Sequence, residues 1–185
     1  MIATIGNPDI LAERKKPWTA LFCSQDCPGS VILPALDHIC DLRDKGRIVV
    51  SGFHSPMERE SFKLLLRGPQ PIVLCPARAI GNMRLPTEWQ KPLAANRLLI
   101  LSPFEANRQR MTAALARERN GFVAALADEI FIVHASPDGS SFNFVRQMLD
   151  KGKKVYTIDA PANLALLKLG VQLLSKQVGP GAIPS

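Results

Sequence analysis

The sequence predicts an α/β protein with three layers, in which helices cover both faces of a mainly parallel sheet of about six strands. Two observations predict this class. Stretches with the helical spacing of apolar residues separate most of the strand-length runs, and the connections are short. The runs themselves are almost continuously apolar, as in strands buried on both faces of a parallel sheet; they span residues 18–23, 48–51, 71–75, 98–101, 129–134 and 154–158.

The helices expected in the first half of the chain have readable ends. The first begins at Ser30 and ends at Gly46, which can adopt left-handed geometry, and Pro34 predicts an irregular start. The second has the strongest start signal. Residues 55–58, Ser-Pro-Met-Glu, combine a capping serine, a proline at the first helical position and a glutamate three residues after the cap. Gly68 and the proline after it end this helix.

In the second half the helical signals are less regular. Residues 80–93 contain Gly and Pro without a clear period, and this predicts an irregular loop. A helical stretch covers 107–128, but Gly121 weakens its middle, so we expect two helices that meet near residues 119–121. A further helix follows Ser140 and Ser141 and ends at Gly152.

The length of 185 residues fits a single domain. We expect an N-terminal extension over 1–17, one domain over 18–177 and a frayed tail over 178–185. No apolar run approaches the ~18 residues of a membrane span, and the start of the chain lacks the apolar segment of a signal peptide. The four cysteines have neither zinc-ligand spacing nor a disulfide pattern. A reduced, soluble, cytoplasmic protein without membrane contact is therefore expected.

The positive charge is concentrated in one third of the chain. The formal net charge is +7, and residues 59–119 hold 11 of the 23 Lys and Arg but only 4 of the 16 Asp and Glu. The rest of the chain is neutral. A basic surface attracts the phosphates of nucleic acid or of nucleotides at long range. A solvated surface that maintains solubility explains the same charge equally well.

Small, hydroxyl-bearing and basic residues follow the predicted strands. Ligands of parallel α/β sheets bind outside the carboxyl ends of the strands, where these residues would meet. Two of the loops lead directly into helix N-termini, where free N–H groups and the helix dipole favour an anion. The pattern predicts a phosphate-binding site built from Ser24, Gln25, Gly52, Phe53, His54, Ser55, Arg78, Ser136, Gly139, Ser140 and Ser141.

Three segments carry a family resemblance over roughly residues 20–159. They are Val-Val-Ser-Gly-Phe at 49–53, the run that starts Arg-Asn at 119–128, and the Asp-Gly-Ser-Ser turn at 138–141. In order and content they resemble motifs of the DNA-processing protein A family, called DprA or Smf, within a Rossmann-like group that includes the LOG phosphoribohydrolases. The resemblance implies a Rossmann-like core that binds single-stranded DNA as a homodimer, in recombination or DNA uptake.

The chain also departs from the family pattern. Where the family has Gly-Ser-Arg after its first strand, this chain has Cys-Ser-Gln, so an arginine expected to touch phosphate is replaced by Gln25. The glycine of the second motif is missing, and Glu58 stands where the family has Asp. The Pro-Gly-Gly motif of the LOG enzymes is absent, so their hydrolytic chemistry has no support in these residues.

Four further residues complete the candidate site, each with a plainer alternative. The resemblance implies that Arg119 holds a phosphate, although a solvated arginine paired with a neighbouring acid explains it too. Asn120 either binds the ligand or caps the following helix. Glu58 accepts from a ribose hydroxyl or only completes the capping box. Ser51 is expected to shape a tight turn with Gly52, where the backbone approaches phosphate.

The sequence gives less support for a functional role of the aromatic and histidine residues near the site. Phe53 is either a platform for base stacking or a core residue. Histidine in general suits acid–base chemistry, yet neither His54 nor His134 has a carboxylate at a fixed spacing to orient it. We expect no catalytic residue, metal or cofactor. The leading hypothesis is a single-stranded DNA-binding protein. The alternatives are a small-molecule nucleotide binder or processing enzyme, and a domain that works through protein partners.

Overall fold

The computed structural model describes residues 2–174, which form one eight-stranded sheet in the order β1-β5-β4-β3-β2-β6-β7-β8. All neighbouring strands are parallel except β1, which pairs antiparallel with β5. The strands are β1 (Ala3–Gly6), β2 (Thr19–Phe22), β3 (Val49–Ser51), β4 (Ile72–Leu74), β5 (Leu98–Ser102), β6 (Glu129–Ile132), β7 (Lys154–Thr157) and β8 (Gln172–Leu173).

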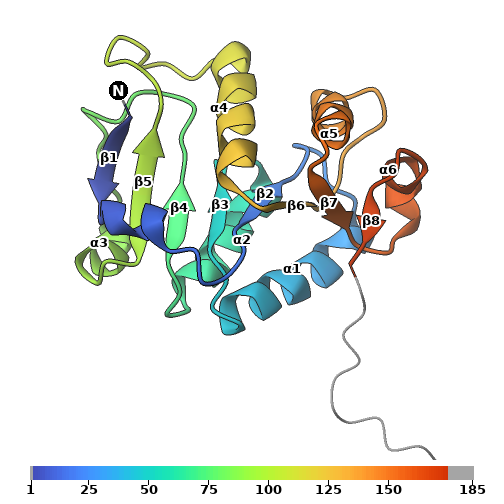
Figure 1. Cartoon of the computed structure of the whole chain (residues 1–185), viewed down its shortest axis with the longest axis horizontal. Helices are drawn as coiled ribbons and strands as arrows, with labels where there is room; N and C mark the ends of the chain where they lie inside the picture. The colour runs from blue at the N-terminus through green and yellow to red at the C-terminus, as the bar shows by residue number, and fades with distance from the viewer. Residues whose placement is uncertain (1, 175–185) are drawn as a thin grey trace, which may run out of the picture.

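Helices cover both faces of this sheet (Figure 1). One core cluster joins the sheet to α1 (Gly29–Asp44), α2 (Pro56–Leu66) and α3 (Thr87–Ala94). The other joins it to α4 (Ala113–Leu126), α5 (Ser140–Asp150), α6 (Leu164–Lys168) and the 3-10 turn at Pro8–Ala12. Ala162, in a second 3-10 turn at Pro161–Asn163, packs against the first cluster. The predicted three-layer α/β class is therefore confirmed. In residues 2–174 no helix is long and apolar enough to cross a membrane.

The six predicted strands all form, and the sheet gains two short strands at its edges. β1 lies within the segment expected as an extension, where its side chains alternate between half-buried and exposed. Only two residues make up β8, and both are exposed. Neither has the continuous apolar run that marks a central strand, so periodicity alone could not identify them. The tail expected over 178–185 lies wholly outside the described residues.

Two helix predictions are wrong. The stretch expected as two helices contains one continuous helix, α4, because Gly121 lies on its exposed side while Val123 and Ala124 pack into the core. Packing of this kind outweighs the roughly 1 kcal/mol that a helical glycine costs. The segment expected as a loop contains α3, which buries Pro92 and packs Trp89 and Leu93 against the core.

His38 gives the fold a pH-dependent stability. It lies half-buried on α1, edge-on to the Phe131 ring at 4.6 Å between centroids, and burial lowers its pKa from 6.5 to about 4 despite the nearby Asp41. The unfolded chain therefore binds more protons than the folded protein between these values. We expect about 2–3 kcal/mol of stability to be lost as pH falls from 6.5 to 4. Urea unfolding of wild type and His38→Gln across this range tests it, because the variant should lose less stability; parallel curves would contradict it.

Candidate functional site

The strand order reverses at the centre of the sheet, and this creates a site for ligands. From β2 the chain moves outward through β3, β4 and β5, then returns to place β6 on the other side of β2 (Figure 1). α4 and α5 both start at the carboxyl edge of the sheet, where ligands of such folds bind. The loops after β2 and β6 are joined there, because Ser24 N–H donates to the His134 carbonyl and Ser136 N–H to Ser24 Oγ.

Arg119 projects from α4 to the ends of β3 and β4 and is only 5% exposed. Its Nη1 donates to the Cys75 carbonyl at 3.1 Å, while Nε is buried without a hydrogen-bond partner. Among the described residues no carboxylate lies within ion-pair distance of this guanidinium. Burial lowers the pKa of Arg119, and the charge of Glu58 partly opposes this. A buried cation without an ion pair is costly, so the arrangement is typical of a site for an anionic ligand.

Gly52 makes room for this guanidinium. A Cβ atom at Gly52 would lie 0.8 Å from Arg119 Nη1, so any other residue would displace the arginine. The sequence interpretation, that the backbone here approaches phosphate directly, therefore needs revision: the side chain of Arg119 occupies that space. The next residue, Phe53, has a φ of 46°, which is rare for a bulky side chain. Such backbone strain is concentrated at functional sites.

Glu58 connects the loop after β3 to the end of β2 through hydrogen bonds. Its carboxylate accepts hydrogen bonds from the N–H groups of Cys23 at 2.9 Å, His54 at 2.7 Å and Ser55 at 3.4 Å. Ser55 Oγ accepts in turn from Glu58 N–H, which confirms the predicted capping box of α2. The carboxylate is buried and accepts three hydrogen bonds from the backbone, so the capping alternative explains Glu58 without a ribose.

A cavity of about 390 Å³ opens beside Arg119 at the start of α4. Thr112 caps this helix by accepting from Leu115 N–H, and exposed Arg108 and Arg110 lie in the loop that leads into it. Within residues 2–174 neither arginine side chain has a hydrogen-bond or ion-pair partner, so both charges are free to attract anions. The cavity is lined by Gly52, His54, Pro76, Ala77, Met111, Thr112, Ala113, Ala116 and Arg119.

Three of the predicted site residues line this cavity, and others line its neighbours. Gly52, His54 and Arg119 meet in it. A groove of about 450 Å³ between α4 and α5 is lined in part by Asn120 and Ser140. Arg78 lines a smaller cavity of about 210 Å³ beside the loop after β5. Gln25 lies apart from all three, in a cavity between α1 and α2.

The remaining predicted residues have structural contacts. Ser51 is buried and donates to the Leu21 carbonyl. Phe53 is only 6% exposed and stacks on Phe62 at 4.5 Å between ring centroids, so the core-packing alternative holds and it offers no platform to a base. Asn120 lies inside α4 and caps no helix. Gly139 is the N-cap residue of α5, and the half-buried Ser141 lies in its first turn.

Sequence reasoning missed the start of α4, which supplies Met111, Thr112, Ala113 and Ala116 to the cavity. The signal was present, because Thr112 directly precedes the helical run and threonine is a preferred cap. Because the helical stretch was expected to begin at residue 107, Thr112 was not identified as its N-cap. Residues 2–174 hold no cluster of three or more His, Cys, Asp or Glu side chains that would bind a metal ion.

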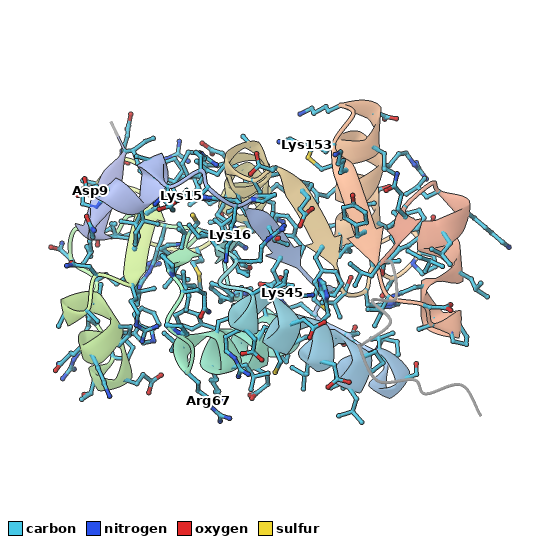
Figure 2. All side chains as sticks on the ribbon, turned by 60° about the horizontal axis from the view of Figure 1, so that its bottom comes forward. Asp9, Lys15, Lys16, Lys45, Arg67 and Lys153 are labelled. Carbon is cyan, nitrogen blue, oxygen red and sulfur yellow. The ribbon has the colours of Figure 1, made fainter. Side chains whose placement is uncertain are left out.

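A second set of basic residues lies at the opposite edge of the sheet and has a different role. Lys16 Nζ donates to the Lys45 carbonyl at the end of α1, and Arg14 Nη1 and Lys153 Nζ donate to the Leu126 and Ala127 carbonyls at the end of α4. Figure 2 labels Lys15, Lys16, Lys45 and Lys153 on this side of the molecule. Lys16, Arg14 and Lys153 thus satisfy carbonyls at the ends of two helices, as is common at C-termini.

Fold and site together define a Rossmann-like α/β protein with a buried arginine at the carboxyl edge of its sheet. The family model described as DNA recombination-mediator protein A matches residues 2–178, so the chain belongs to this family. The family resemblance seen in the sequence is thereby confirmed. The search of curated proteins gives no match.

Solved structures share the fold at low sequence identity. DNA processing protein A from Streptococcus pneumoniae is 18% identical with a TM-score of 0.75; the match covers 94% of this chain and 62% of that one. The Helicobacter pylori protein, described for its single-stranded DNA binding mode, is 17% identical with a TM-score of 0.76, covering 93% and 80%. A molybdenum cofactor binding protein from Rippkaea orientalis is 11% identical with a TM-score of 0.59, covering 88% and 91%.

Proposed function

We propose that this protein binds single-stranded DNA at the cavity beside Arg119 and acts in DNA processing during recombination or uptake. Membership of the DNA recombination-mediator family supports this, as does the fold shared with a Helicobacter pylori protein described as binding single strands. The observation that carries the proposal is the Arg119 guanidinium, which is buried, has no ion pair among the described residues and lines an open cavity.

A phosphate of the strand would complete this arrangement. The guanidinium is planar and can present two parallel N–H groups to two phosphate oxygens. The first turn of α4 also borders the cavity through Thr112, Ala113 and Ala116, so the positive end of its helix dipole adds to the attraction for an anion. A flexible single strand can bring a phosphate into such a recess. A duplex, with a persistence length of about 150 base pairs, is too stiff to do the same without distortion.

The salt dependence of binding tests this proposal. We expect an oligothymidylate to bind saturably in fluorescence anisotropy, with log affinity falling against log salt concentration by about 0.7 for each phosphate contacted. A duplex of the same length should bind more weakly. Absence of saturable binding at ~50 mM salt, where electrostatic attraction is strong, would overturn the proposal.

A small-molecule nucleotide binder is the second candidate. The cavity beside Arg119, at about 390 Å³, has the size typical of a small-ligand pocket. The fold shared with molybdenum cofactor carriers supports the same possibility. A rise in melting temperature with nucleoside phosphates, but none with oligonucleotides, would favour this candidate over DNA.

We also propose that the protein is a cytoplasmic homodimer. Leu164 on α6 and Leu173 on β8 are 55% and 45% exposed at the same end of the sheet, and exposed leucines favour self-association. Light scattering on the purified chain should give twice the monomer mass of 20.2 kDa. A monomer at all protein concentrations would contradict this.

A further inference from the structure

We propose that the groove between α4 and α5 binds a nucleobase of the same strand whose phosphate lies beside Arg119. This inference rests on the proposed function and adds a second subsite to it. The groove has a volume of about 450 Å³ and is separate from the arginine cavity, although Ala113 and Ala116 line both. The two openings therefore lie on adjacent flanks of one helix, about 10 Å across.

Each wall of the groove is one stripe of a helix, with lining residues at positions i, i+3, i+4 and i+7. On α4 the side chains nearest the sheet-edge end are small, and this leaves space between the helices. The α4 stripe is Ala113, Ala116, Arg117 and Asn120, and the α5 stripe is Ser140, Asn143, Phe144 and Gln147.

Phe144 supplies an aromatic surface to this groove. It is half-buried, packs against the core and meets Phe22 edge-on, with 4.9 Å between ring centroids and an interplanar angle of 67°. The contact with Phe22 holds the ring in place. A fixed aromatic ring at the side of a groove is the element on which single-stranded bases stack, because every base has a π face.

The polar side chains of the groove have donors and acceptors that are not used in hydrogen bonds within the described residues. Asn143 and Gln147 are exposed, and within residues 2–174 neither carboxamide has a hydrogen-bond partner. Carboxamides both donate and accept, so they match the edges of all four bases. Asn120 Oδ1 is buried without a partner, a cost that rotation of its carboxamide toward a base would relieve. Arg117, exposed and unpaired in the same part of the chain, would contact the adjoining phosphate.

The position of the two cavities on adjacent flanks of α4 favours a nucleobase over other occupants. A strand whose phosphate lies on Arg119 crosses the first turn of α4 at Ala113 and Ala116, and this places its next base over the groove. An aromatic side chain together with carboxamides and one cation is the combination that binds bases, whereas a peptide-binding groove would need a more apolar lining.

The test compares an oligothymidylate with an abasic oligomer of equal length, which keeps the phosphates and lacks the bases. We expect wild type to bind the base-bearing strand about tenfold more tightly, because the stacking of one base on an aromatic ring raises affinity by about that factor. Phe144→Leu and the double variant Asn143→Ala/Gln147→Ala should each reduce this preference severalfold and leave the affinity for the abasic strand unchanged. Gln90→Ala, an exposed carboxamide on α3, is the matched control and should retain the full preference.

The outcomes separate this inference from the proposed function. If wild type binds neither oligomer, the proposed function fails and the base subsite fails with it. If wild type binds both oligomers equally, phosphate binding stands and the base subsite is overturned. If the preference for bases persists in both α5 variants, bases bind elsewhere on the protein and the groove is likewise overturned.

Discussion

Replacing Arg119 by methionine is expected to abolish tight binding of single-stranded DNA while the fold is retained or becomes more stable. The guanidinium is buried, makes one hydrogen bond to the Cys75 carbonyl and has no ion pair in residues 2–174. Truncating one partner of a buried charged pair costs 2–5 kcal/mol in binding, so we expect a loss of about a hundredfold or more in affinity. Methionine fills much of the same space without a charge to desolvate, and such replacements are often neutral or stabilising.

The opposite signs of the two effects make this prediction diagnostic. If the role of Arg119 were purely structural, its substitution would lower the free energy of unfolding. If the arginine is retained for its ligand, the substitution should lower DNA affinity without lowering the free energy of unfolding. Anisotropy titrations measure the affinity, and denaturant unfolding measures the free energy of unfolding. Loss of several kcal/mol of stability together with unchanged DNA affinity would remove Arg119 from the binding site.

Two variants serve as companions to this measurement. Gly52→Val introduces side-chain atoms where Arg119 Nη1 lies, so it should reduce binding although no phosphate contact is deleted. Arg67→Ala is the matched control, because this exposed arginine is the C-cap residue of α2, whereas the cavity is lined by Gly52 and His54 before the start of that helix. Figure 2 shows Arg67 projecting outward from the end of the helix. We expect its DNA affinity to remain within about twofold of wild type at moderate salt, since an isolated surface charge is screened.

The sequence predicts the central part of the fold well because burial there is uniform. The runs that form β3 and β4 are fully buried, so every residue is apolar or small and the strand is recognisable without its partners. β1 is recognisable only through its antiparallel pairing with β5, which is a tertiary contact. For the same reason α3 escaped prediction: Pro92 looks like a helix breaker in the sequence, but lies buried within the helix.

The candidate site shows a similar limit. The strand-end rule placed Gly52 and His54 near the ligand, and the family resemblance added Arg119. The sequence could not show that only a glycine at position 52 leaves space for the Arg119 side chain, since residues 52 and 119 meet only in the folded protein. Nor could it show that the carboxylate of Glu58 accepts hydrogen bonds from three backbone N–H groups. Both facts depend on side-chain positions across separate elements, which periodicity does not encode.

Glu58 is the residue whose loss should cost the fold most at this edge of the sheet. Glu58→Ala leaves the N–H groups of Cys23 and Ser55 buried without this acceptor and breaks the capping box with Ser55. Each unsatisfied buried donor costs about 1–3 kcal/mol, so we expect a loss of about 3 kcal/mol or more in the free energy of unfolding. Urea unfolding measures this loss, with Glu60→Ala as the control because Glu60 is exposed on the same helix.

A second substitution separates the hydrogen bonds of Glu58 from its charge. Glu58→Gln keeps one acceptor oxygen, and we therefore expect it to recover part of the stability that alanine loses. The same change removes the negative charge that acts on Arg119, so the guanidinium should hold a phosphate at least as tightly as in wild type. Lower stability with retained or higher DNA affinity is thus the expected pair of results. If Glu58→Gln instead abolished DNA binding in a folded protein, the carboxylate would itself contact the ligand, and the structural role argued for it would be wrong.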